Sequence, residues 1–268
     1  MTATLDKTAA PKWTWRDAPL PVGMALIAIA ALVLWHFSPW THYMHLTLPS
    51  AGGHEHHGST AEPGMTTMVG LFTGAWLLMT IAHMLPTAIP LLASFRRVSA
   101  KRPGRFWLVA GVVGGFLTVW AAAGFAVSFA HVHLRYLVEM NSLAAAAPWF
   151  LVATLAAAGA YQFSGFIAKC VTACRSPFSF IGKHWKGGRG VAKQSFLIGA
   201  DYGQSCLGCC AALMVVMFVV GSASHLWMIV FALLGVVQKS ARWGAKLTRP
   251  FGVGFLVSAG VVAALQVV

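Results

Sequence analysis

Three cysteines fall within the stretch GADYGQSCLGCCAALMVVMF, residues 199–218, which is otherwise apolar enough to cross a membrane. On a helix, residues three and four positions apart share a face, so Cys206, Cys209 and Cys210 would occupy an arc of about 100°. Clustered thiolates favour soft or borderline cations, with Cu(I) ahead of zinc. The pattern therefore predicts a metal site; the alternative is that these small side chains only serve close helix packing.

Asp201 precedes these cysteines on the same helix. A carboxylate inside a membrane costs about 2.5–3.5 kcal/mol and is usually paired, so Asp201 is a candidate metal ligand or a polar anchor. A second thiol pair, Cys170 and Cys174, has helical i, i+4 spacing in KCVTACRSP. The neighbouring basic residues Lys169 and Arg175 would raise thiol reactivity or metal affinity, and a purely structural pair is the competing interpretation.

One histidine lies within the apolar stretch GAWLLMTIAHMLPTAIPLLASF. Pro86 lacks the amide that would pair with the carbonyl of Ala82, so we expect a kinked helix beside His83. Ionisable residues at membrane depth normally face the interior of the helix bundle. We predict that His83 contributes to a functional site with the cysteines, although a buried histidine can also be bonded only to a neighbour.

Further histidines cluster near the predicted outer face. The segment WHFSPWTHYMHLTLPSAGGHEHHGSTAEPGM holds six of the eleven histidines, and imidazole is a common ligand for zinc, copper and nickel. His131 and His133 end a predicted span, where they could converge with His36 or His42. The competing interpretation is a set of interfacial polar caps and a solvated linker.

These residues must be positioned by membrane helices. The chain is 58% hydrophobic and only 9% charged, with a mean hydropathy of +0.71, whereas soluble proteins are about 25% charged. An apolar run of about 20 residues spans a bilayer. The predicted fold is an all-α, polytopic transmembrane bundle of about seven spans, near residues 19–38, 66–94, 106–130, 143–168, 195–220, 225–238 and 250–267.

The basic residues predict the orientation of these spans. They fall before the first span and after the second, fourth and sixth, the last group including Lys239. Positive residues mark cytoplasmic loops, so we expect a cytoplasmic N-terminal segment at 1–18 and an outside C-terminus. Residues 19–268 would form one transmembrane domain with a His-rich outer loop at 40–65. The net charge of +13 is then explained by topology and lipid headgroups, and we expect no nucleic-acid partner.

Glycines at four-residue spacing predict where helices approach closely. Gly111 with Gly115 and Gly199 with Gly203 follow the small-residue pattern of tight helix packing in membranes.

Four blocks of the sequence resemble a known family: AHMLPTAIPLL, YQFSGFIAKCVTACRSP, GADYGQSCLGCCAALMVVMFVVG and LWMIVFALLGVVQKSARWGAKLTRP. They are similar to the bacterial predicted metal-binding integral membrane proteins, a domain-of-unknown-function family, over most of residues 65 to 265. The G-x-x-C-x-G-C-C element is the most specific part. The resemblance implies a multi-pass inner-membrane protein with a metal site, and it carries over the five cysteines at 170, 174, 206, 209 and 210.

Two positions depart from the family pattern. A Glu-Lys pair is common in the family where this chain has Gln238 and Lys239, and methionine is usual in place of His83. The first departure removes an acidic candidate ligand, and the second adds a nitrogen donor.

The working hypothesis is a membrane protein for uptake, transfer or storage of copper, with zinc as the alternative ion. Outer histidines would collect the ion, His83 and the three clustered cysteines would hold or pass it, and Cys170 with Cys174 would receive or release it inside. A metallochaperone is a candidate partner. The alternative is an accessory subunit of a membrane enzyme complex, such as a copper-dependent oxidase or monooxygenase. A third hypothesis is a membrane enzyme that uses the intramembrane thiols for redox or group transfer. The chain has no recognisable nucleophile–base pair, which favours a protein without catalytic activity of its own over an enzyme.

Overall fold

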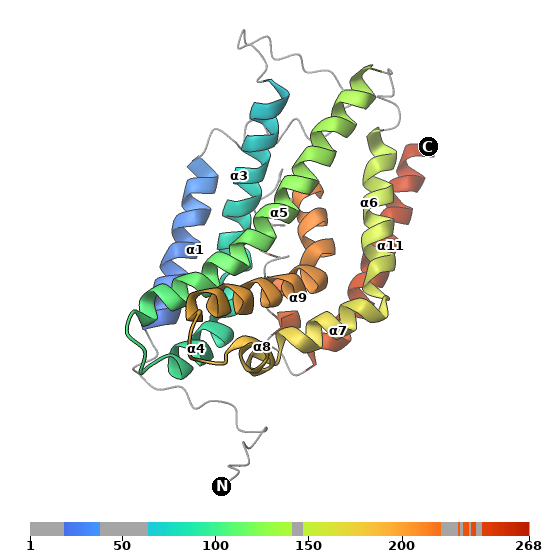
Figure 1. The fold of residues 1–268 in the computed structure, drawn as a ribbon. Helices are drawn as coiled ribbons and strands as arrows, with labels where there is room; N and C mark the ends of the chain where they lie inside the picture. Colours follow the sequence, from blue (N-terminus) through green and yellow to red (C-terminus); the bar gives the residue numbers. More distant parts are fainter. Residues whose placement is uncertain are drawn as a thin grey trace.

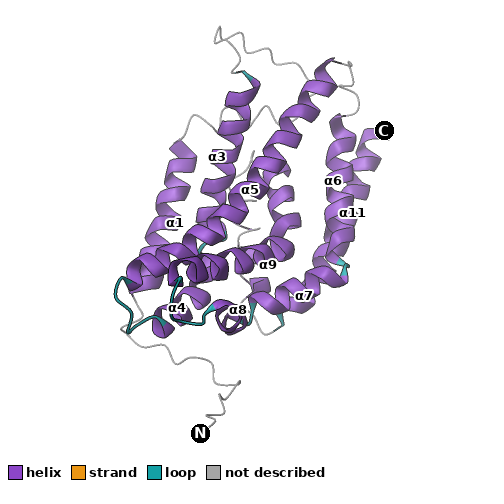
Figure 2. Ribbon diagram, in the orientation of Figure 1, coloured by secondary structure: helices purple, strands orange, loops and turns teal. Residues whose placement is uncertain are grey.

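The computed structural model describes residues 19–37, 64–140, 147–220, 230, 233–235, 237–239 and 243–267. Within these residues every regular element is a helix and no strand occurs (Figure 2). The predicted all-α class is therefore confirmed. The helices are α1 (Pro19–Phe37), α3 (Met65–His83), η3 (Pro86–Ala88), α4 (Ile89–Val98), α5 (Arg105–Met140), α6 (Ala147–Gln162), α7 (Gly165–Cys174), α8 (Pro177–His184), α9 (Val191–Val220), η6 (Gly244–Leu247) and α11 (Thr248–Val267).

Four helices of the described part are long and apolar enough to cross a membrane. They cover Met65–His83, Arg105–Leu134, Val191–Met217 and Thr248–Gln266, and the bent pair Trp149–Gln162 with Gly165–Cys174 would make a fifth span. α1 contributes a shorter apolar stretch, Val22–Leu34. Most of the predicted run at 225–238 lies outside the described residues. Four or five spans are thus supported, and the count of seven stays a prediction.

The second predicted span, at 66–94, is broken in its middle. α3 ends at His83, and the amides of Met84 and Leu85 both donate to the carbonyl of Thr80. The single 3₁₀ turn η3 follows before α4 begins. Pro86 starts that turn, as expected where a proline removes a helical hydrogen bond. The predicted kink beside the histidine is confirmed.

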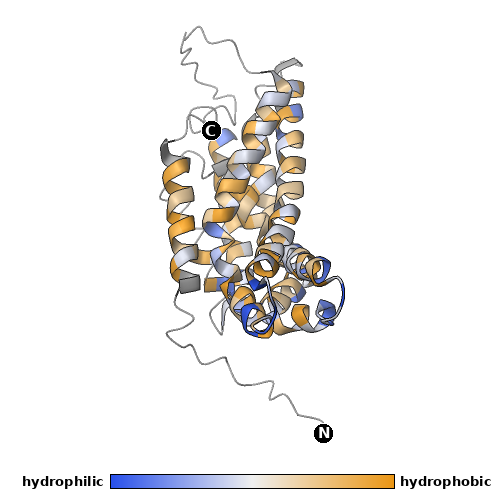
Figure 3. Cartoon of the chain, turned by 60° about the vertical axis from the view of Figure 1, so that its left-hand side comes forward, coloured by the Kyte–Doolittle hydropathy of each residue, from blue (hydrophilic) through white to orange (hydrophobic). Residues whose placement is uncertain are grey.

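The upright helices meet a curved one at the centre of the fold. In Figure 1, α9 first runs across the lower end of the bundle and then turns upward between α5 and α6. α6 and α11 lie side by side, while α4, α7 and α8 occupy the lower end. Hydrophilic residues gather at this same end (Figure 3). The basic connections after α4 and after α7 are therefore on one side, in accord with the predicted topology, whose orientation in the membrane stays a prediction.

Glycines bring α5 and α9 into backbone contact. A Cβ at Gly199 would collide with the carbonyl oxygen of Val112, and a Cβ at Gly115 would collide with that of Phe196. A Cβ at Gly111 or Gly203 would also meet its neighbours, at 3.3 Å. The close helix packing predicted from the glycine spacing is confirmed.

Buried side chains form two cores that share α9. The larger core joins α9 to α1, α3, α4, α5, α7 and α8 and contains all five cysteines. The smaller core joins α9 to α6 and α11 through residues such as Leu213, Leu155 and Phe255. α9 is therefore the element around which the rest of the helices are packed.

Candidate metal centre

A sharp bend between α6 and α7 turns the second thiol pair toward α9. The two helices meet at 69° across a break of two residues. Ser164 has an extended backbone there, and its hydroxyl accepts a hydrogen bond from the amide of Ile167, which caps α7. Because of this new helix start, Cys170 and Cys174 lie one turn apart on the buried face of α7.

The three cysteines of α9 share one buried face, as the spacing predicted. Cys206 is fully buried, and Cys209 and Cys210 are 1% exposed. The thiol of Cys209 donates to the backbone carbonyl of Cys206 at 3.2 Å. Met214 and Met217 follow in the same core and are equally buried. Thiol and thioether sulfurs therefore continue along this side of the helix.

The two thiol groups form one cluster. The Sγ atoms of Cys174 and Cys209 are 3.8 Å apart, and those of Cys209 and Cys210 are 3.4 Å apart. Cys170 packs against the same helix, because a Cβ added at Gly208 would lie 2.5 Å from its Sγ. The sequence predicts Cys170 and Cys174 as a separate pair that would receive or release the ion inside. The bend after α6 instead brings Cys174 against the cysteines of α9.

Lys239 was assigned to a basic cytoplasmic loop, but it is buried against the thiols. Its side chain is 8% exposed, and its Nζ lies 2.9 Å from the Sγ of Cys206. The same nitrogen donates to the hydroxyl of Thr87 at 3.0 Å and lies 4.0 Å from the sulfur of Met84. A lysine directly after an apolar run, as in GVVQKSAR, was the one available indication of burial.

Two tyrosines tie the cluster to the surrounding helices. The hydroxyl of Tyr161 donates to the carbonyl of Gly208 at 2.6 Å, which joins α6 to α9. The hydroxyl of Tyr202 donates to the carbonyl of Thr87 at 3.2 Å, which joins α9 to the helix break. These bonds position the thiols from both sides, and sequence reasoning gave no role to either tyrosine.

His83 is buried at the end of α3, beside the helix break. Its Nδ1–H donates to the carbonyl of Met79 at 2.9 Å, so Nε2 is the nitrogen left to bind a ligand. No hydrogen bond joins His83 to a cysteine in the part of the chain that the structure describes. A site shared by His83 and the cysteines therefore stays a prediction.

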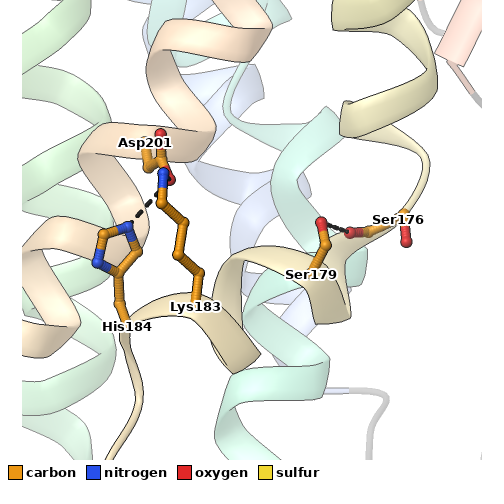
Figure 4. A network of polar contacts seen from close by, with 5 residues as sticks. All are labelled: Ser176, Ser179, Lys183, His184 and Asp201. Carbon is orange, nitrogen blue, oxygen red and sulfur yellow. Dashed lines mark hydrogen bonds and ion pairs between the residues drawn. The ribbon is translucent and has the colours of Figure 1, made fainter.

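Asp201 is held by two basic residues from α8 (Figure 4). Its Oδ2 lies 2.7 Å from the Nζ of Lys183 and 2.9 Å from the Nε2 of His184. At the start of α8, the hydroxyl of Ser179 donates a hydrogen bond to the carbonyl of Ser176. The expected pairing of the carboxylate is confirmed, and its partners favour the polar anchor over the metal ligand.

The two described histidines at the outer end of α5 contact aromatic rings. His133 donates from Nδ1 to the carbonyl of Phe129 and stacks on that ring at 3.8 Å. His131 meets the ring of Phe72 edge-on. The side chain of His36 and all of His42 lie outside the described residues. Their convergence into an outer metal site therefore stays a prediction.

The donor set fits a soft metal ion. Metal–thiolate bonds of about 2.3 Å place two sulfurs on a tetrahedral ion about 3.8 Å apart and on a linear ion about 4.6 Å apart. The Cys174–Cys209 pair is 3.8 Å apart and the Cys209–Cys210 pair is 3.4 Å apart, so small movements bring either pair onto one ion. As the side chains stand, no three His, Cys, Asp or Glu residues among those described surround a common ion position.

A comparison with family models identifies the same region. No curated protein and no solved structure gave a significant match to the chain. One family model, described as PpoB2, copper chaperone, matches residues 73–262. This range holds His83, Lys239 and all five cysteines, and it covers well over half of the 268 residues. A buried thiol cluster that suits a soft ion and the family match point the same way: the chain belongs to the PpoB2 copper chaperone family.

Proposed function

We propose that this protein is an integral membrane copper carrier that holds Cu(I) between α7 and α9. The observation that carries the proposal is the 3.8 Å separation of the Sγ atoms of Cys174 and Cys209. These residues come from two helices, so the ion would bridge α7 and α9. Copper is the cargo here, and a recipient protein would take it from the cluster.

The surroundings of the cluster support Cu(I) over harder ions. Thiolates and thioethers select Cu(I), whereas carboxylate and carbonyl oxygens suit magnesium or calcium. Met84, Met214 and Met217 are buried in the same core as the cysteines, and Asp201 is already bound by two basic side chains. Contact with water would favour oxidation of Cu(I) and of its ligands. Burial of the cluster excludes that water.

The path of the ion is simpler than the sequence suggested. Cys170 and Cys174 were expected to form a separate receiving site on the cytoplasmic side, but Cys174 adjoins Cys209 directly. We propose one thiol cluster that takes the ion from the outer histidines through His83 and the buried methionines. The cluster releases it at the end where α7 and α8 lie.

Metal titration tests the proposal. Protein purified in detergent under anaerobic, reducing conditions is loaded with Cu(I) in competition with a chromophoric chelator. We expect stoichiometric Cu(I) in the wild type and a loss of affinity in C209S. A211S, a half-buried change on the same helix, is the matched control and should keep the wild-type affinity. Failure of the wild type to compete for Cu(I) would overturn the proposal.

A further inference from the structure

Lys239 is surrounded by three acceptors. Its Nζ contacts the Sγ of Cys206 at 2.9 Å, the Oγ1 of Thr87 at 3.0 Å and the Sδ of Met84 at 4.0 Å. A lysine ammonium has three N–H donors and no acceptor. The environment therefore matches a cationic side chain, one donor for each neighbour.

Thr87 is oriented to receive this cation. Its hydroxyl donates to the carbonyl of Met84 at 2.7 Å, so the lone pairs of the oxygen remain for Lys239. Its own carbonyl accepts the hydroxyl of Tyr202. The break between α3 and α4 thus holds two of the acceptors of Lys239, Met84 and Thr87, beside the thiols.

Among the residues that the structure describes, no carboxylate is hydrogen-bonded to Lys239. In the described residues its hydrogen-bond partners are two sulfurs and one hydroxyl. Asp201, on the same helix as Cys206, is bound by Lys183 and His184 instead. A buried cation is strongly destabilised unless an opposite charge lies close to it. The thiol cluster is the available source of that charge.

We propose that Lys239 is a specificity-determining residue that makes the thiol cluster prefer a monovalent metal ion to a divalent one. The inference rests on the proposed function, because it requires the cluster to bind metal. A cysteine binds as thiolate, giving its proton to solvent. Two thiolates and Lys239 sum to one negative charge, which a monovalent ion neutralises. A divalent ion leaves one positive charge in a buried site.

The size of this preference follows from the short distance between the charges. Lys239 contacts Cys206 and also interacts electrostatically with Cys209 and Cys210. For two unit charges about 5 Å apart at an effective dielectric constant of about 20, each extra charge on the ion lowers affinity about 300-fold. Relaxation and residual water reduce the effect, and we expect at least about a tenfold preference.

Two soft ions of different charge test the inference without redox chemistry. Affinities for Ag(I) and Cd(II) are measured by competition in the full-length wild type and in K239M. We expect the ratio of Ag(I) to Cd(II) affinity to fall at least about tenfold in K239M. K239R keeps the charge and should retain the wild-type ratio. K246M, the same change at an exposed lysine, is the matched control.

A further variant separates charge from structure. T87V removes one acceptor of Lys239 but keeps the cation, so it should leave the ratio near that of the wild type even where it lowers thermal stability. An unchanged ratio in K239M, or an equal fall in T87V, would overturn the inference. Absence of Ag(I) and Cu(I) binding in the wild type would instead overturn the proposed function itself.

Discussion

The Sγ atoms of Cys174 and Cys209 lie 3.8 Å apart, although 35 residues separate the two cysteines in the chain. The contact crosses from the short helix α7 to the long helix α9. It depends on the bend after α6, because an unbroken helix would carry Cys174 further along the axis of α6. The contact between the two thiols is therefore coupled to the placement of α7.

The first prediction concerns this pair. C174S and C209S should each lower Cu(I) affinity by more than about 100-fold, because even residues that only support a ligand cost about 10–100-fold. The double variant should lose little more than either single one, since one remaining thiol cannot bridge the helices. Chelator competition measures all three. Additive losses would show that the two thiols bind separate ions.

The second prediction concerns the contact beneath the cluster. A Cβ at Gly208 would lie 2.5 Å from the Sγ of Cys170 and 3.0 Å from the ring of Phe166. G208A should push α7 away from α9, lower the free energy of unfolding by about 1–3 kcal/mol and weaken Cu(I) binding. G70A, where nothing lies within 4 Å, should leave both unchanged. Equal stability and equal Cu(I) affinity in G208A and G70A would contradict the close packing of Gly208 against Cys170.

Local patterns predicted much of the fold and half of the site. The 3.6-residue period placed Cys206, Cys209 and Cys210 on one face, and Pro86 predicted the helix break, because both effects act within a few residues. The approach of Cys174 to α9 was not predictable in this way. It depends on a bend at Phe163 and Ser164. The long apolar run around these two residues gives no local signal for that bend.

Lys239 shows why charge patterns mislead at the ends of spans. A basic residue that follows an apolar run usually marks a cytoplasmic loop, and that rule assigned Lys239 to solvent. Its burial depends on acceptors from α9 and from the helix break, which are distant in sequence. Only the three-dimensional arrangement reveals such a partner set.

The third prediction concerns the start of α7. S164A removes the oxygen that accepts the amide of Ile167, and loss of a helix N-cap costs about 1 kcal/mol. We expect lower thermal stability and faster release of bound Cu(I), because Cys174 is then held less firmly against α9. S164D should restore both values, since aspartate is an equally good cap. Unchanged release in S164A would separate the cap from the metal site.

The fourth prediction concerns His83. Its Nδ1 is bound to Met79, and Nε2 is available for a passing ion. H83L should therefore leave the equilibrium affinity for Cu(I) within about threefold of wild type, because sulfur ligands dominate the site, but slow the rate of loading from outside. Stopped-flow mixing of vesicles with Cu(I) measures that rate. A large loss of equilibrium affinity would place His83 among the resident ligands.

The last prediction distinguishes the anchor from the ligands. D201N removes the negative charge that holds Lys183 and His184, so α8 should be less firmly attached to α9. The side chain of Lys183 is 63% exposed, and exposed ion pairs contribute at most about 1 kcal/mol, so we expect a modest loss of thermal stability. Copper stoichiometry and affinity should stay at the wild-type level, because the carboxylate oxygen is occupied by its basic partners. A loss of bound copper in a variant that remains folded would instead make Asp201 a ligand.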